Sequence, residues 1–224
     1  MSTLLLRLAA PLQAWGTDSK FEVRRTNREP SKSGVIGLLA AALGLRRDAD
    51  LSRLSALRFG VRVDRNGEVI KDFHMAKAEK TSYLTYRYYL SDAIFLVGLE
   101  SEDRSFLEQI ERALRNPCFP LFLGRRSCPP TLPLVLGIRE DALETALRGE
   151  ENQNKDLKSI RQSHRYIRLD CGAGEQEGAV VQDLPVSFNP MKREFGYRRA
   201  KEIWLRDDVN TEESAEEHDA MAEL

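Results

Sequence analysis

The stretch RFGVRVDRNGEVIKDFH (residues 58–74) bears on the fold more directly than any other part of the sequence. Apolar and polar residues alternate on both sides of Asn66-Gly67, as they do in two half-buried strands. Asn-Gly between two such runs is the strongest short-range signal for a β-hairpin, because both residues tolerate positive φ. The sequence therefore predicts a hairpin with strands at 58–64 and 68–74.

The segments around this hairpin show further strand and helix patterns. A strand at 3–9 carries leucines on one face. Ser33 offers an N-cap to an apolar helix at 34–43, which Gly44 ends. The elements predicted after the hairpin are a strand at 89–99, a helix at 104–115 and two apolar runs at 119–123 and 132–138.

This order of elements indicates an α+β protein. It approximates the β-α-β-β-α-β plan of ferredoxin-like domains, which RNA-recognition modules share. The strand at 89–99 is one more than that plan requires. It could pair with the hairpin and form the base of an arm whose tip is residues 75–87.

The pattern of residues in the sequence changes after residue 149 and again after residue 206. We expect residues 1–149 to form the ferredoxin-like domain and residues 150–206 to form a small β-rich C-terminal unit. Residues 207–224 hold eight carboxylates and no Lys or Arg, and we expect this acidic tail to be disordered. Without those eight, the 34 basic side chains face 27 acidic ones, so the rest of the chain carries +7 although the whole carries −1.

Composition excludes several classes of protein. No apolar run approaches the ~20 residues of a membrane span, and no basic segment precedes the run Leu4–Ala10 as in a signal peptide. Cys118, Cys128 and Cys171 are odd in number and widely spaced, as in cytosolic thiols. We therefore expect a cytoplasmic protein without a membrane segment, a disulfide framework or a zinc site.

Two basic clusters have the composition of phosphate sites. One precedes and begins the first helix, where free N–H groups favour anions, and it includes Arg24, Arg28, Ser31, Lys32 and Ser33. A solvated loop with an ordinary serine cap is the alternative. The other is the loop Gly124, Arg125, Arg126 and Ser127, which follows an apolar run and has main-chain and side-chain donors for a phosphate.

Residues 75–87 interleave cations with tyrosines. Lys77, Lys80 and Arg87 accompany Tyr83 and Tyr86, a pattern that suits tracking a sugar-phosphate backbone and stacking unpaired bases. An exposed loop is the alternative. A fourth group has the same ambiguity and surrounds an aromatic pair: Lys192, Arg193, Arg198 and Arg199.

Catalytic signals are sparse. Asp72 and His74 are two apart on a strand, so they share a face and could form a base and its orienting group, or simply a hydrogen-bonded strand end. The sequence has no metal-ligand spacing, phosphate-binding P-loop or dinucleotide fingerprint. We predict no catalytic residue, metal or cofactor.

Taken together, the motifs resemble the type I-E branch of the fifth Cas protein family. The best-matching part is residues 3–138. The matching motifs are Leu6–Gly16, Phe21, Arg24, Thr26, Pro30–Leu39, Asp72–His74, Arg87, Tyr89-Leu90, Asp92-Ala93, Phe95 and Leu123–Pro129, with looser matches at Leu184-Pro185, Phe188 and Arg193–Phe195. The predicted RNA-binding set also includes Gln13, within the first motif.

The resemblance implies a subunit of the CRISPR Cascade surveillance complex that holds the 5′ handle of the guide RNA. It implies a ferredoxin-like domain, a thumb at about residues 75–88, contacts with the backbone and large subunits, and target DNA as a partner of the complex. Relatives of type I-C cut precursor RNA with a Tyr, Lys and His set, but no Lys-His neighbour pair occurs here. The expected role is a non-catalytic RNA binder; a metal-independent endoribonuclease that uses His74 and a protein-only scaffold are the alternatives.

Overall fold

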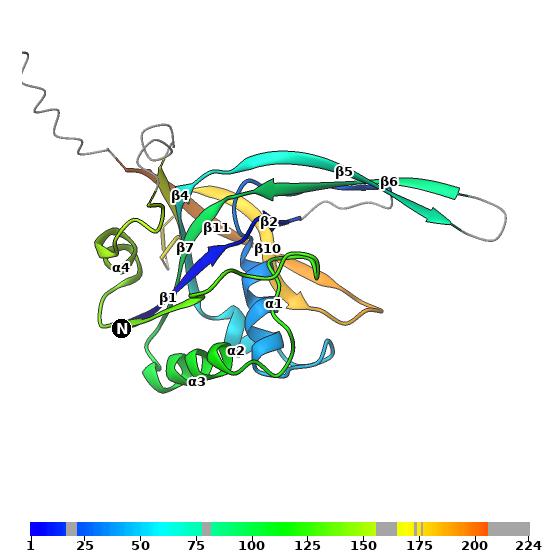
Figure 1. Ribbon diagram of the computed structural model, residues 1–224. Helices are drawn as coiled ribbons and strands as arrows, with labels where there is room; N and C mark the ends of the chain where they lie inside the picture. Colours follow the sequence, from blue (N-terminus) through cyan, green and yellow to red (C-terminus); the bar gives the residue numbers. More distant parts are fainter. Residues whose placement is uncertain (17–21, 78–81, 156–164, 173, 176, 206–224) are drawn as a thin grey trace, which may run out of the picture.

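A computed structural model describes residues 1–16, 22–77, 82–155, 165–172, 174, 175 and 177–205 (Figure 1). The chain is a mixed α/β protein with mostly antiparallel strands and few helices. Its strands are β1 (Ser2–Ala9), β2 (Leu12–Gln13), β3 (Val23–Arg24), β4 (Arg58–Arg65), β5 (Glu68–Lys77), β6 (Ser82–Ser91), β7 (Ile94–Ser101), β8 (Val135–Arg139), β9 (Tyr166–Asp170), β10 (Ala179–Ser187) and β11 (Glu194–Trp204). Its helices are α1 (Lys32–Ala42), α2 (Ser52–Ser55), α3 (Arg104–Arg115) and α4 (Leu143–Gly149).

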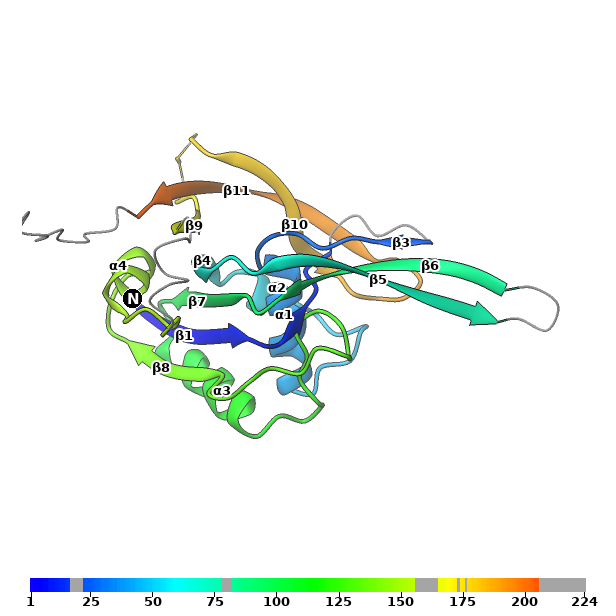
Figure 2. The same ribbon diagram turned by 45° about the horizontal axis from the view of Figure 1, so that its top comes forward.

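A seven-stranded sheet in the order β10-β11-β9-β4-β7-β1-β8 forms the body of the protein. Leu4, Leu6 and Leu8 of β1 belong to the larger apolar core, which contains the buried residues of α1 and α3. Leu5 faces the opposite way and belongs to a second core with the buried residues of α4. Figure 2 shows β8, β1, β7 and β4 side by side, with α3 and α4 at different positions around them. The predicted strand at 3–9 is confirmed, and burial on both faces explains its continuous leucine run.

The predicted hairpin at Asn66-Gly67 is wrong. β4 pairs with β7 and β9 in the seven-stranded sheet, whereas β5 pairs with β6 in a separate four-stranded sheet. Gly67 does adopt a positive φ of 67°, but the turn lets the chain leave one sheet for the other. A Cβ at Gly67 would lie 2.5 Å from the carbonyl oxygen of Ser91, so a side chain would block this close crossing.

The predicted strand at 89–99 is split by a matching break. β6 ends at Ser91 and β7 begins at Ile94, with Asp92 at a φ of 54° between them. Because β4 pairs with β7 and β5 pairs with β6, the four strands form one long antiparallel ribbon, bent where it crosses between sheets. Figure 1 shows the β5–β6 part extending well beyond the body. Residues 78–81, which connect β5 to β6 in the sequence, lie outside the described residues.

The two long helices form largely where the sequence predicts them. α3 spans the predicted residues, and Asp103 caps it by accepting a hydrogen bond from the Phe106 N–H at 3.0 Å. α1 begins two residues earlier than predicted, because its N-cap is Ser31 rather than Ser33. Ser31 is extended and its hydroxyl accepts from the Gly34 N–H at 3.2 Å. No helix in the described part of the chain is long and apolar enough to cross a membrane.

The C-terminal strands extend the seven-stranded sheet. β9 pairs with β4, and β11 pairs with both β9 and β10. All three strands lie within residues 150–206, but they share a sheet with the N-terminal strands. The division of the chain at residue 149 stays a prediction, and the acidic tail lies outside the described residues.

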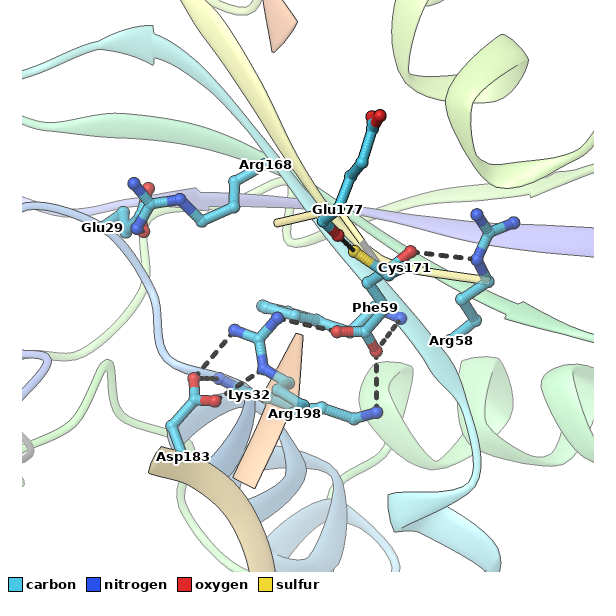
Figure 3. A network of polar contacts seen from close by, with 10 residues as sticks. Glu29, Lys32, Arg58, Phe59, Arg168, Cys171, Glu177, Asp183 and Arg198 are labelled. Carbon is cyan, nitrogen blue, oxygen red and sulfur yellow. Dashed lines mark hydrogen bonds and ion pairs between the residues drawn. The ribbon is translucent and has the colours of Figure 1, made fainter. Parts of the chain in front are cut away.

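A buried ionic network joins these C-terminal strands to α1 (Figure 3). Arg198 of β11 donates to Asp183 of β10 at 2.6 and 3.0 Å and to Asp170 of β9 at 2.7 Å. Lys32 donates from its side chain to Asp170 at 2.9 Å and from its backbone N–H to Asp183 at 2.7 Å. Burial opposes the charge on Arg198, but the two carboxylates outweigh it and raise the Arg198 pKa.

Removing one member of this network should destabilise the fold strongly. Asp183→Ala leaves the Arg198 guanidinium and the Lys32 N–H without their shared acceptor, which typically costs about 3–5 kcal/mol in a buried pair. The free energy of unfolding in urea measures the loss. Arg115→Ala, which breaks an exposed pair with Glu111, is the matched control and should cost less than about 1 kcal/mol. Equal effects of the two substitutions would contradict a stabilising role for the network.

Candidate nucleic-acid interface

The loop Gly124–Ser127 is held tightly against the body. The Ala14 N–H donates to the Leu123 carbonyl at 3.1 Å, and the Cys128 N–H closes the loop by donating to Arg125 at 2.9 Å. Gly124 has a φ of 85°, and a Cβ there would lie 1.7 Å from the carbonyl oxygen of Ala14. Only glycine fits this position, so it fixes where the following arginines project.

Arg125 joins this loop to two neighbouring strands. Its Nη2 donates to the carbonyl oxygen of Arg24 at 2.9 Å, and its guanidinium lies 4.6 Å from the centre of the Tyr89 ring. Arg24 and Arg87 are partners in the parallel pairing of β3 with β6. The structure therefore brings together Arg24, Arg87 and Arg125, which are far apart in the sequence.

Two arginine nitrogens in this cluster have no internal acceptor. Arg87 Nε and Arg125 Nη1 are buried and have no hydrogen-bond partner among the described residues. Burial would raise the pKa of Tyr89, but hydrogen bonds with Ser127 and Arg125 and the Arg125 charge outweigh it and lower that pKa. The cluster thus favours negative charge and holds two buried N–H donors that have no acceptor among the described residues.

Arg126 and Ser127 are exposed beside this cluster, and Arg24 and Arg28 are exposed on the segment that leads to α1. The cluster therefore combines exposed guanidinium groups with a Tyr89 ring that is itself buried. Tyr89 was not among the predicted RNA-binding residues. It is two residues from Arg87, and this spacing could have indicated it because both side chains lie on the same face of a strand.

The start of α1 differs from the predicted phosphate site. Its Lys32 N–H is taken by Asp183, and the Lys32 side chain is buried in the ion pair with Asp170. The prediction that Lys32 contacts RNA therefore needs correction, because a protein carboxylate already occupies that donor. Ser31 is buried as the helix cap, whereas Ser33 is partly exposed and 3.3 Å from it, hydroxyl to hydroxyl.

Gln13 is also committed to internal contacts. Its side-chain amide donates to the Ala93 carbonyl at 2.7 Å, and its Oε1 accepts from the Trp15 indole N–H at 3.0 Å. Gln13 is fully buried, and Trp15 is a core residue at 1% exposure. Gln13 therefore positions the segment next to Gly124 and does not face a ligand, contrary to its place in the predicted binding set.

The β5–β6 ribbon carries exposed aromatic and apolar side chains. Phe73 is 66% exposed, Met75 is 69% exposed and Tyr83 is 57% exposed. Lys77 is exposed near the end of β5, and Lys71 lies 4.0 Å from the centre of the Tyr86 ring. The predicted contact Lys80 lies outside the described residues. Paired strands begin at Glu68, so the ribbon includes residues before the predicted arm tip at 75–87.

The remaining predicted groups are less compact. His74 Nε2 lies 2.7 Å from Asp72 Oδ2 on the half-exposed ribbon, so the two do share a face. Of the fourth basic group, Arg198 is buried in the ionic network and Arg193 lies over Phe188 and Phe195 at 5.8 and 5.2 Å. Within the described residues, no three His, Cys, Asp or Glu side chains gather closely enough to hold a metal ion.

A family model described as CRISPR-associated protein (Cas_Cas5) matches residues 3–201. The chain belongs to this family. It is 40% identical over 159 residues to the CRISPR system Cascade subunit CasD of Escherichia coli (strain K12), a match that covers 61% of this chain and 70% of that protein. The resemblance found in the sequence motifs is confirmed.

Two solved structures support the same family assignment. A structure titled "CRISPR RNA-guided surveillance complex" contains a chain that matches with a TM-score of 0.73 and 31% identity, covering 90% of this chain and 89% of that one. A "Crystal structure of Cas protein" matches with a TM-score of 0.68 and 42% identity, covering 91% and 94% of the two chains. The mixed α/β architecture is therefore that of solved Cas proteins.

The glycine in the interface loop gives a direct test of its geometry. Gly124→Ala forces a Cβ onto the Ala14 carbonyl and should lower the free energy of unfolding by about 2 kcal/mol or more. Gly149→Ala is the control, because a Cβ there meets nothing within 4 Å, and this change should be neutral or slightly stabilising. Urea unfolding of the two variants measures the difference. Equal stability would contradict the close approach at Gly124.

Proposed function

We propose that this chain binds single-stranded guide RNA as a non-catalytic subunit of a type I-E CRISPR surveillance complex and holds the 5′ handle of that RNA. The observation that carries the proposal is the cluster of Arg24, Arg87 and Arg125 around Tyr89, with buried arginine N–H groups that lack an internal acceptor. Phosphate oxygens provide the acceptors that such groups need, and guanidinium groups suit them because they donate in pairs.

The interface that we propose has three parts. The loop Gly124–Ser127 contributes main-chain donors and the arginines Arg125 and Arg126. The segment before α1 contributes Arg24 and Arg28, and the first turn of α1 contributes the partly exposed Ser33. The ribbon contributes Arg87 and Lys77, with exposed aromatic rings for unpaired bases. Ser31, Lys32 and Gln13 are buried, and in this proposal they position the surface without contacting RNA. Lys80 also belongs to the proposed set, but it lies outside the described residues.

The finer description of the fold is part of this proposal. We interpret the body as a ferredoxin-like domain, the β5–β6 ribbon as the thumb, and β9, β10 and β11 as a small C-terminal unit. The length of the ribbon and its exposed apolar side chains support its assignment as the thumb, because such a surface is typical of an element that contacts partners.

The partners follow from the similarity to CasD and to a chain of a surveillance complex. We propose that the chain assembles in the cytoplasm with backbone and large subunits around one guide RNA, and that it meets target DNA only within the complex. Two observations support a non-catalytic role. The arginines of the cluster are arranged to bind an anion, and the Asp72-His74 pair is half-exposed on the ribbon.

Loss of phosphate contacts should appear in the salt dependence of binding. The double variant Arg125→Ala, Arg126→Ala should bind guide RNA more weakly, and the slope of log affinity against log salt should fall by about 0.7 for each lost contact with single-stranded RNA. Filter binding at several salt concentrations measures both quantities. The matched control is Arg112→Ala, Arg115→Ala on α3, which should leave the slope unchanged. A double variant that binds like wild type would contradict the assignment.

The proposal also predicts no cleavage of repeat RNA by the purified chain. Incubation with labelled repeat RNA in EDTA should leave the RNA intact, for wild type and for His74→Ala alike. Site-specific cleavage by wild type that His74→Ala abolishes would overturn the non-catalytic assignment in favour of a metal-independent endoribonuclease. Assembly with partner subunits without any protection of RNA would instead indicate a protein-only scaffold.

A further inference from the structure

A groove of about 1120 Å³ lies beside α1. One wall is a face of the helix made largely of small residues, including Gly34, Gly37 and Ala41, and the others come from residues 45–48, 119–124 and 188–193. Ser33 and Gly124 also line the groove, so it continues from the loop and the segment of the proposed interface. The volume exceeds the ~300–1,000 Å³ of a typical small-molecule pocket, so more than one planar ring fits.

Three phenylalanines from two distant segments line this groove. Phe119 is 43% exposed, and Phe122 and Phe188 are partly exposed. Phe188 packs beside α1, with ring atoms 3.8 Å from where a Cβ on Gly37 would lie, and Phe195 meets it edge-on at 6.5 Å between ring centres. These contacts hold the Phe188 ring in place before any ligand arrives. Preplaced rings suit stacking, which needs a fixed aromatic plane.

The charged residues that line the groove are mostly basic. Arg46, Arg47 and Arg193 are exposed there, against the single carboxylate of Asp48. Arg193 is positioned over the rings of Phe188 and Phe195 at 5.8 and 5.2 Å. Aromatic rings with arginines beside them form the combination that binds unpaired bases and their phosphates.

We propose that this groove binds one or two unpaired bases of the guide RNA, stacked against Phe119 and Phe188, with adjacent phosphates at Arg46, Arg47 and Arg193. This inference rests on the proposed function and extends it to a second contact area. A protein segment is the less suitable occupant, because the groove combines separate aromatic rings and an excess of arginines with direct continuity to the Gly124 loop. The RNA would therefore pass from the arginine cluster over Gly124 into the groove.

Photocrosslinking locates such a base directly. Guide RNA with 5-iodouridine placed at one position at a time in its 5′ single-stranded segment is bound to the wild-type chain and irradiated, and the crosslinked peptides are mapped by mass spectrometry. One or two adjacent positions should crosslink to residues 119–122 or to Phe188. Crosslinks confined to residues 124–127 and the ribbon would overturn the groove proposal while leaving the proposed function intact. Absence of guide-RNA binding by wild type would overturn both.

Aromatic variants separate stacking from phosphate binding. Phe119→Ala combined with Phe188→Leu, which keeps apolar packing but loses the second ring, should weaken guide-RNA binding by roughly 5- to 150-fold for each stacked base. The salt slope should stay at the wild-type value, in contrast to the change expected for Arg125 and Arg126. Tyr197→Ala is the control, because Tyr197 is an exposed aromatic residue outside the groove lining.

Two results would contradict the proposal. The first is unchanged affinity of the phenylalanine double variant when its unfolding curve matches that of wild type. The second is protection of residues 119–122 and 188–193 from hydroxyl-radical footprinting by partner subunits in the absence of RNA, which would assign the groove to a protein contact. Protection that appears only when guide RNA is added supports the groove as an RNA site.

Discussion

The bent ribbon of β4–β5 and β6–β7 is the constraint on which the rest of the structure depends. The inner part of the ribbon, β4 and β7, belongs to the seven-stranded sheet. The outer part, β5 and β6, forms most of a second sheet. The crossing is tight enough that Gly67 must approach the backbone of Ser91. Because the ribbon leaves the body at this point, β6 carries Arg87 and Tyr89 past the loop that holds Arg125. The cluster of Arg24, Arg87 and Arg125 therefore lies where ribbon and body meet.

The sequence predicted the local chemistry better than the pairing of strands. Alternation and the Asn66-Gly67 pair correctly indicated strands on both sides, and Gly67 has the expected positive φ. The pairing failed because a turn signal specifies local backbone geometry and not which strand lies alongside. The seven-stranded sheet offers β4 the neighbours β7 and β9, and these long-range pairings override the local hairpin.

The candidate site was predictable only where it depends on local sequence, and not where it depends on long-range contacts. The glycine and arginines of the 124–127 loop were selected from the local sequence, and the positive φ and close approach at Gly124 explain the glycine. The phosphate contacts of the arginines stay a proposal. The buried roles of Lys32 and Gln13 depend on Asp170, Asp183, Ala93 and Trp15, mostly far away in the sequence. A basic residue at a helix start is equally compatible with a phosphate and with a protein carboxylate, and only the fold decides between them.

The central claim is that the Arg24, Arg87 and Arg125 cluster is where the chain meets RNA. A structure of this chain bound to the 5′ segment of its guide RNA tests it most directly. The account predicts a phosphate oxygen within hydrogen-bond distance of the Arg125 or Arg87 guanidinium, next to the Tyr89 ring. RNA bound elsewhere, with both guanidinium groups in the positions they have now and no phosphate near them, would contradict it.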